Sequence, residues 1–158
     1  MKRLIIAGAI LLVFAAALPA QSSQQQIVGI ETGVVFGYNL APATQGLGTG
    51  QEMAISLSVA QNMHAGFAYV QGDGANMPNL SLLRFNYFVA DRLGLAVSAG
   101  MDGANPTGGV GLFASILGRT FEDTLYTGLG LRVEYLVDLT TGVEEALLMF
   151  GLGARVGI

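Results

Sequence analysis

A strict two-residue alternation of apolar with small or charged side chains constrains this chain more than any other feature. It is clearest between Leu125 and Val137, where the odd-numbered residues are Leu, Thr, Leu, Leu, Val, Tyr and Val. The even-numbered residues from 126 to 134 are Tyr, Gly, Gly, Arg and Glu. Successive side chains of a β-strand point to opposite faces, so this segment predicts a strand with one apolar face. At a helical period the same residues would scatter around the axis.

The same alternation recurs along the chain, and the segments that carry it are separated by stretches rich in Gly, Pro, Asp or Asn. The predicted strands are 28–38, 51–60, 65–70, 82–89, 93–101, 108–117, 125–137 and 146–158. The predicted loops after the first, third, fifth and seventh strands are 41–50, 72–79, 102–107 and 138–144, whereas the second and fourth strands are followed by very short turns. An even number of strands, most of them near the roughly 9–11 residues of a tilted membrane strand, is typical of a transmembrane barrel.

The first twenty residues have the parts of a secretory signal peptide. Met1–Arg3 is basic, Leu4–Leu18 is almost wholly apolar, and small and polar residues follow. We expect cleavage after Ala20, which leaves a polar N-terminal segment, 21–26, and one barrel domain, 27–158. The alternative, a retained membrane helix, is disfavoured because the apolar run is short for a span of about 20 residues.

Composition excludes several classes of protein. The chain has no Cys, so disulfides do not stabilise it outside the cytoplasm. Loss of the signal peptide removes Lys2 and Arg3 and leaves five basic residues against eleven acidic ones, which argues against a nucleic-acid ligand. Charged residues make up 11% of the chain, against roughly 25% in a typical soluble domain. No mature segment is long and apolar enough for a spanning helix, so the structure that can pair every backbone group in lipid is a closed β-barrel.

The bulky face of each predicted strand must meet either lipid or a core. A lipocalin-like soluble barrel, which is also eight-stranded and secreted, would turn its apolar residues inward. An eight-stranded barrel has an interior only just wide enough for side chains. The second face of each strand, opposite the bulky one, carries mostly Gly, Ala and Ser. These small residues fit such an interior, whereas the bulky ones would overfill it. We therefore predict an all-β, eight-stranded antiparallel up-and-down transmembrane β-barrel with both termini periplasmic. A soluble barrel or sandwich is the alternative.

The export signal, the eight alternating segments and a strand at the end of the chain resemble the small eight-stranded outer-membrane barrels. The transmembrane domain of outer membrane protein A and the outer-membrane-protein-X type belong to this class. The resemblance covers essentially the whole mature chain and rests on a pattern rather than a motif. It implies a Gram-negative-type outer membrane, surrounding lipid, and the barrel-assembly machinery as a partner during biogenesis. One departure is that such barrels usually end in an aromatic residue read by that machinery, whereas this chain ends in Ile158.

Ionisable residues on the second face form the most informative candidate site. Three acids and three bases are predicted to point into the lumen: Glu31, Glu52, Glu134, Arg84, Arg132 and Arg155. A charge away from water is costly unless it is paired. Because the first and last strands must pair to close the barrel, we expect a contact between Glu31 and Arg155. The preferred interpretation is a charge network that fills and stabilises the barrel, and the alternative is a gated or narrow polar pore.

Tyrosines fall near the ends of several predicted strands. Tyr38, Tyr69 and Tyr135 lie near outer ends, and Tyr87 lies near an inner end. This placement is typical of the aromatic girdles at membrane interfaces.

Catalytic and metal chemistry find little support in the sequence. The single histidine, His64, falls in a predicted periplasmic turn and is expected to be solvated. With no Cys and no second His, neither a metal site nor a cofactor is expected. The segments GDGAN and MDGAN lack the spacing of an EF-hand and are interpreted as turns.

The sequence thus predicts a non-enzymatic outer-membrane barrel with a structural or surface-interaction role, whose short acidic loops would meet an extracellular ligand. The alternative function is a narrow pore for small or hydrophobic solutes.

Overall fold

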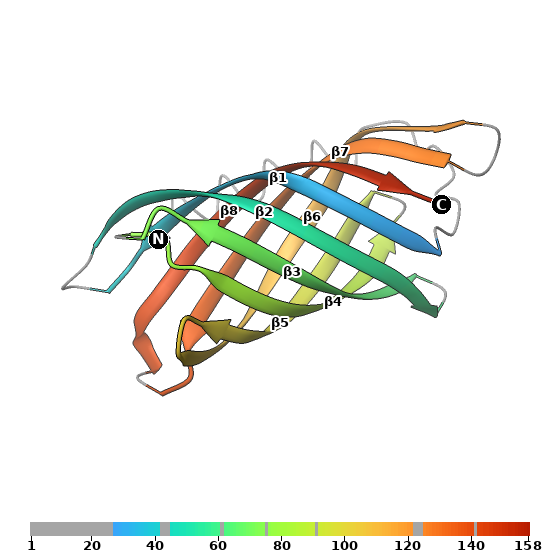
Figure 1. The fold of residues 1–158 in the computed structure, drawn as a ribbon. Coiled ribbons are helices and arrows are strands. Elements are labelled where there is room, and N and C mark those ends of the chain that lie inside the picture. The colour runs from blue at the N-terminus through green and yellow to red at the C-terminus, as the bar shows by residue number, and fades with distance from the viewer. Residues whose placement is uncertain are drawn as a thin grey trace.

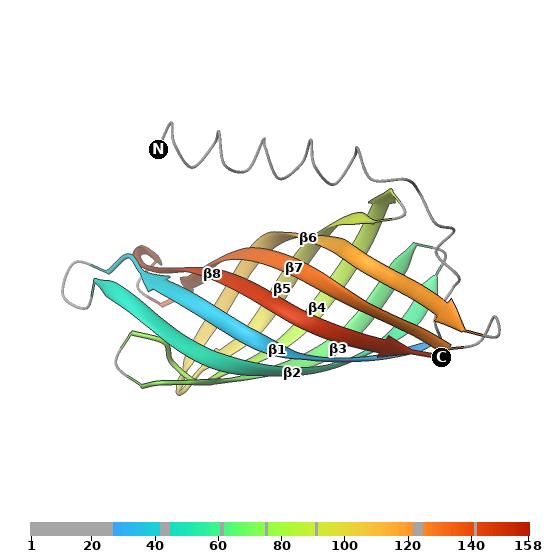
Figure 2. The same ribbon diagram turned by 90° about the horizontal axis from the view of Figure 1, so that it is seen from above.

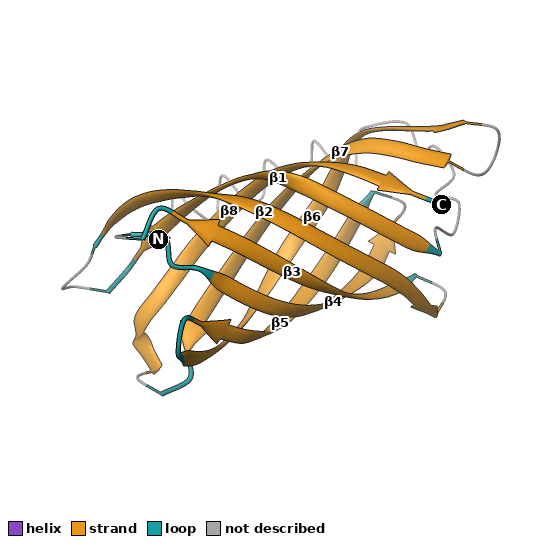
Figure 3. Cartoon of the chain, viewed as in Figure 1, coloured by secondary structure: helices purple, strands orange, loops and turns teal. Residues whose placement is uncertain are grey.

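The computed structural model describes residues 27–41, 45–60, 62–74, 76–90, 92–121, 125–140 and 142–158, without the side chains of 142–145. These residues form one closed antiparallel barrel (Figures 1 and 3). Its strands are β1 (Val28–Asn39), β2 (Gly46–Ala60), β3 (Met63–Gly72), β4 (Leu80–Ala90), β5 (Leu93–Asp102), β6 (Asn105–Phe121), β7 (Leu125–Asp138) and β8 (Gly142–Gly157). The predicted signal peptide and the polar segment 21–26 lie outside the described residues.

Every strand pairs with its sequence neighbours, and β1 pairs with β8 to close the barrel. The predicted up-and-down order of eight strands is therefore confirmed. Figure 2 shows the strands tilted around a common axis. One end, here called the loop end, holds the connections β1–β2, β3–β4, β5–β6 and β7–β8. The other, the terminal end, holds the three remaining connections and also Ile27 and Ile158, which are joined by a backbone hydrogen bond of 2.7 Å.

Strand alternation sorts bulky side chains to the outside of the barrel, as the sequence predicted. The exposed outward residues include Ile30, Val34, Phe36, Met53, Ile55, Leu57, Phe67, Leu83, Phe85, Leu95, Val97, Val110, Phe150, Leu152 and Val156. These side chains form a broad belt of exposed apolar residues around the barrel. Separately, no helix among the described residues is long and apolar enough to cross a membrane.

Several predicted boundaries are wrong, and in each case the strand is longer than expected. Residues 46–50, predicted as part of a loop, pair with β1 from Asn39 to Val35, because glycines lack a side-chain pattern yet still pair through the backbone. Likewise β6 begins at Asn105, and Gly103 at φ +56° makes a two-residue turn after β5. The predicted asymmetry of long and short connections is consequently limited to β1–β2 and β3–β4, whose connections span 40–45 and 73–79.

The predicted face of β6 is correct only for its first part. The β6–β7 register shifts between Ser115 and Leu117, where two steps along β6 match one step along β7, so β6 has one extra residue. Such a bulge reverses the alternation of the residues that follow it. As a result Leu117 points outward and is exposed. An unbroken alternation from Gly111 through Phe113 and Ser115 would put Leu117 on the lumen face.

Candidate functional site: the barrel lumen

A buried ion cluster lies at the centre of the lumen. Arg84 of β4 donates to both oxygens of Glu52 of β2, with Nη1–Oε1 at 2.6 Å and Nη2–Oε2 at 3.0 Å. The same guanidinium donates to Glu134 of β7, with Nε–Oε1 at 3.1 Å and Nη2–Oε2 at 2.5 Å. Ser98 of β5 donates its hydroxyl to Glu134 Oε1 at 2.5 Å. The cluster thus joins four strands across the barrel.

This cluster is fully removed from water, which determines what it can do. Glu134 is 0% exposed, and the side chains of Glu52 and Arg84 are almost as inaccessible. Buried charges are tolerated when each is paired and its remaining hydrogen-bonding capacity is used. Bidentate contacts of an arginine with carboxylates also fix the relative positions of the side chains, because the N–H groups of the planar guanidinium point in set directions. The cluster is therefore a rigid cross-brace of the barrel rather than a set of groups free to bind a solute.

The terminal half of the lumen holds the other three predicted charges. Glu31 and Arg155 face each other in the β1–β8 register, as closure of the barrel requires. The ion pair of Glu31, however, is with Arg132 of β7, at 3.4 Å between Nη2 and Oε2. The hydrogen bonds of Arg155 go instead to Ser56 Oγ at 3.3 Å and to His64 Nδ1 at 3.2 Å. The expected register is present, but the side chain of Glu31 extends over Gly153 of β8 to Arg132 on the next strand.

His64 is placed differently from the prediction. It belongs to β3 rather than to a turn, because only residues 61 and 62 separate β2 from β3. Its ring points into the lumen, is buried, and makes an edge contact with Phe88 at 5.1 Å between ring centroids. Phe88 in turn contacts Phe113 at 4.9 Å. His64 is therefore a packed lumen residue beside Arg155 and not a solvated turn residue.

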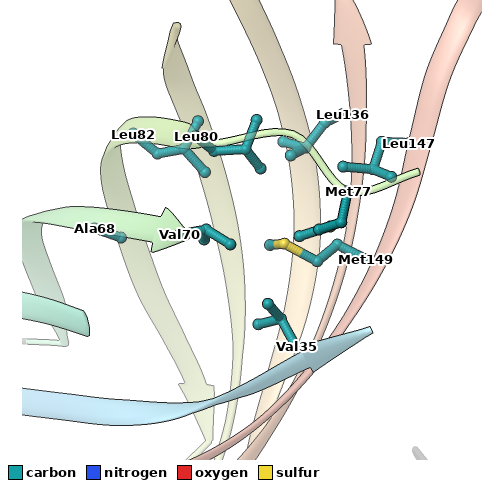
Figure 4. Packing of buried hydrophobic residues seen from close by; sticks show 9 residues of the cluster. All are labelled: Val35, Ala68, Val70, Met77, Leu80, Leu82, Leu136, Leu147 and Met149. Atoms are coloured by element: carbon teal, nitrogen blue, oxygen red, sulfur yellow. The ribbon is translucent and has the colours of Figure 1, made fainter. Parts of the chain in front are cut away.

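An apolar cluster closes the lumen at the loop end. Figure 4 shows its side chains converging from the wall of the barrel on Met77, which comes from the β3–β4 loop. The cluster consists of Val35, Ala68, Val70, Met77, Leu80, Leu82, Leu136, Leu147 and Met149. Met77 is 0% exposed although it lies in a loop. We call this set the apolar plug; water has no polar partner within it.

The β3–β4 loop is held over the lumen by hydrogen bonds to its neighbours. Asp73 accepts hydrogen bonds from the backbone N–H of Thr49 at 2.8 Å and of Met77 at 3.2 Å. Asn76 Nδ2 donates to the carbonyl of Leu47 at 3.2 Å. The bond from Thr49 is the largest cause that lowers the pKa of Asp73 below its usual range, so its carboxylate stays charged in this loop. Within the GDGAN segment, Gly74 lies in the connection between β3 and β4 and has φ +96°, a left-handed conformation that favours glycine.

Glycines of the barrel wall make room for the plug. A Cβ on Gly37 would lie 2.4 Å from Met77 Sδ, and one on Gly48 would lie 2.5 Å from the backbone nitrogen of Met77. Both distances are shorter than real Cβ contacts allow. The wall near the loop end is therefore shaped around this one methionine.

Sequence reasoning missed the plug. The alternation of their strands puts Leu82, Leu147 and Met149 on the lumen face, but nothing in the sequence connects their bulk with Met77. The available signal was a change along the lumen face of β8, which runs from Leu147 and Met149 to glycines and then Arg155.

The predicted interfacial tyrosines all lie on the outward face. Tyr69 and Tyr87 are exposed, and Tyr38 and Tyr135 are half-buried among neighbouring outward residues. Tyr126 is the exception among the tyrosines of the chain, because its hydroxyl lies in the lumen 2.9 Å from Ser115 Oγ. Among the described residues no group of three or more His, Asp or Glu side chains is arranged to hold a metal ion.

Comparisons with known proteins support the fold. No protein-family model matches the chain, and no curated protein matches it. One similar solved structure is a de novo designed transmembrane β-barrel, with 19% identity and a TM-score of 0.49 over 86% of this chain and 99% of the design. Another is neisserial surface protein A, with 13% identity and a TM-score of 0.54 over 83% of this chain and 97% of that protein. The resemblance drawn from the sequence holds at this level: the chain has the fold of the small eight-stranded transmembrane β-barrels.

Proposed function

We propose that this protein is a bacterial outer-membrane barrel with a structural or surface-interaction role, whose lumen is closed to solutes. The exposed apolar belt supports a place in lipid, because a water-facing barrel would turn this face inward. Monomeric soluble proteins rarely expose apolar patches larger than a few hundred Å², whereas here outward apolar residues occur on every strand.

The main support for a closed lumen is that two different barriers follow each other along the barrel axis. The apolar plug fills the loop end, and the Arg84 cluster spans the middle of the barrel. An ion would have to cross a dry apolar region and then displace paired charges, and each step is costly. Opening either barrier alone would leave the other in place.

The orientation belongs to the same proposal. The terminal end, with both ends of the described barrel and short turns at 61–62 and 91–92, would face the periplasm. The loop end would then face outside, and the β3–β4 loop with Asp73 and Asn76 would form part of the surface seen by a ligand or a neighbouring molecule. Tyr38, Tyr69 and Tyr135 would lie at the outer interface and Tyr87 at the inner one.

A narrow pore is the second candidate, and one observation favours it. The terminal half of the lumen is polar and contains glycines at which an added Cβ would make only an ordinary van der Waals contact, such as Gly130. A pore would require the Met77 loop to leave the lumen and the Arg84 cluster to rearrange. The pore is therefore the less favoured function.

Fractionation tests the location. The full chain, expressed with its own N-terminal segment in a Gram-negative host, is expected in the outer-membrane fraction. A folded barrel in that fraction should migrate differently on a gel before and after boiling. Recovery of the protein from a detergent-free periplasmic extract would overturn the proposal.

Conductance tests the closed lumen. The refolded protein, inserted in a planar bilayer, is expected to show no reproducible channel openings. The matched comparison is a variant with both barriers weakened, Met77→Ser combined with Arg84→Ser, examined in the same membrane. Regular openings by the unmodified protein would support the pore instead.

A further inference from the structure

Arg132 is a buried cation whose hydrogen-bonding capacity is mostly unused. Its side chain is 8% exposed, and its one ion pair among the described residues joins Nη2 to Glu31 at a long 3.4 Å. Its Nε and Nη1 are shielded from solvent and have no hydrogen-bond partner among the described residues. Arginine in proteins remains charged. Leaving such donors unpaired costs more than the loss of an ordinary hydrogen bond, so a further group is expected beside them.

The charge balance of the terminal half is positive. Arg132 and Arg155 share one nearby carboxylate, Glu31, which acts on both guanidiniums. The described hydrogen bonds of Arg155 go to neutral acceptors, the Ser56 hydroxyl and the His64 ring. The next carboxylates, Glu52 and Glu134, are held by Arg84 in the middle of the barrel, and Glu52 also interacts electrostatically with Arg132. The six lumen charges therefore balance overall, and the excess of positive charge is local to the terminal half. The buried N–H groups of Arg132 without a partner among the described residues are what favours a further acceptor there.

Space for a small ligand lies next to Arg132. Gly130 precedes it by two residues on the lumen face of β7, and Gly151 faces it on β8. A Cβ on Gly130 would meet only the carbonyl oxygen of Ala114, at 3.4 Å. A Cβ on Gly151 would have its nearest neighbours at 3.5 and 3.7 Å. Elsewhere the lumen glycines are crowded; Gly37 and Gly94, for example, would place a Cβ within 2.4 Å of a neighbouring side chain.

We propose that the terminal half of the lumen contains a binding site for a small monovalent anion of the halide type, held by the unpartnered N–H groups of Arg132 beside Gly130 and Gly151. Arg155 supplies the second positive charge of the site. The anion accepts hydrogen bonds from Nε and Nη1 of Arg132 and occupies the room left by the glycines. A small ion fits because an eight-stranded barrel is only just wide enough for side chains. The side chains of Glu31 and Arg155 are both partly exposed, which gives the site a path from the terminal end.

Unfolding in the presence of different salts tests the site on the whole refolded protein. Urea unfolding in an uncharged detergent is followed in sodium chloride and in sodium gluconate of the same ionic strength, because gluconate is too large for the lumen. A ligand that binds only the folded state raises the folding constant by a factor of one plus its concentration divided by its Kd. For a site that is half-saturated near 50 mM, this is about an 11-fold increase at 0.5 M chloride. Identical unfolding curves in the two salts would overturn the proposal.

Variants separate a specific site from a general salt effect. The stability of the Arg132→Met variant against urea is expected to be the same in chloride as in gluconate. The matched control is Arg119→Met, because Arg119 is exposed and stacks over Phe121 at 5.0 Å instead of facing the lumen. This control should keep the full response of the unmodified protein. Equal chloride responses of the two variants would contradict the site.

A crystallographic measurement keeps the proposal testable if Arg132→Met does not fold. Crystals of the unmodified protein grown in bromide should show an anomalous peak next to Arg132 and Gly130. Ordered water at that place without an anomalous peak would show that solvent alone satisfies Arg132, and the proposal would be wrong.

Discussion

The two halves of the lumen fill the same narrow space in opposite ways. Toward the loop end the wall carries Leu136, Leu147 and Met149, and a loop supplies Met77 as the central piece. Toward the terminal end the same strands carry glycines, Arg132 and Arg155. The Arg84 cluster lies between them and separates a dry apolar region from a polar one.

The difference shows that two kinds of side-chain contact, apolar packing and charge pairing, can fill different parts of the same narrow lumen. Apolar packing at the loop end needs close contact with every neighbour, and the glycines there are fitted to Met77. In the middle of the lumen, the paired charges need a hydrogen-bond partner for every polar group but fill little volume. The terminal half is packed closely around His64, Phe88 and Phe113, but its charge pairing is incomplete at Arg132, and this is the place that a ligand or water would occupy.

The largest expected effect comes from removing the cation of the central cluster. Arg84→Met leaves Glu52 and Glu134 buried without their partner, which should lower the free energy of unfolding by about 3–5 kcal/mol. Equilibrium unfolding in urea measures this loss. The exposed Arg119→Met is the control and should change stability by less than about 0.5 kcal/mol. A loss below about 1 kcal/mol in Arg84→Met would mean that the cluster does not brace the barrel.

A smaller loss is expected when the plug is shortened. Met77→Ala removes the central side chain of the apolar cluster and should cost about 2–3 kcal/mol in unfolding free energy. Met53→Ala is the matched control, because Met53 is 67% exposed on the outward face. If both variants lose the same stability, Met77 contributes no more than an ordinary outward residue.

A pair of glycine substitutions compares the two halves directly. Gly37→Ala would place its Cβ 2.4 Å from Met77 Sδ, whereas Gly130→Ala would meet nothing nearer than 3.4 Å. Overpacking costs typically about 1–3 kcal/mol, so Gly37→Ala should be clearly less stable than the unmodified protein. Gly130→Ala should change stability by less than about 0.5 kcal/mol. Thermal unfolding under identical conditions ranks the two variants, and the reverse order would contradict the account.

The smallest effect concerns pH and the loop that holds Met77. Hydrogen bonds, first of all from the backbone N–H of Thr49, lower the pKa of Asp73 below its ordinary value of 3.8. A carboxyl whose pKa is lower in the folded state stabilises that state above the ordinary pKa, and this contribution disappears as the pH falls through the lowered value. Asp73→Asn should therefore be slightly less stable than the unmodified protein at pH 7. The difference in melting temperature between the two proteins should disappear as the pH falls below 3.8 and through the lowered pKa of Asp73. A difference that does not depend on pH would exclude the charge as its cause.

Strand positions and faces could be predicted from the sequence because alternation is a local property of each strand. The features that the sequence did not reveal depend on partners far along the chain. The bulge at Ser115–Leu117 is a property of the β6–β7 pairing, and the pairing of Glu31 with Arg132 depends on how far the Glu31 side chain extends over β8. Met77 lies in a polar loop sequence, and only the closed barrel gives its side chain an apolar place.

The lumen charges illustrate the same limit. The residue types and their face indicated that Glu52, Arg84 and Glu134 point inward, since each follows the alternation of its own strand. Which of them pair could not be predicted, because β2, β4 and β7 come together only when the sheet is closed. His64 was misplaced because β3 begins two residues earlier than its alternation of bulky side chains.

Accessibility of single cysteines tests the central claim most directly, because the chain has no cysteine of its own. Ala68→Cys places a thiol in the apolar plug, and Gly130→Cys places one beside Arg132. In the protein inserted in liposomes, a small charged thiol reagent should label the position 130 cysteine from the terminal end and leave the position 68 cysteine unlabelled from both sides. Labelling of both positions from both sides would show a continuous aqueous path and contradict a lumen closed at the loop end.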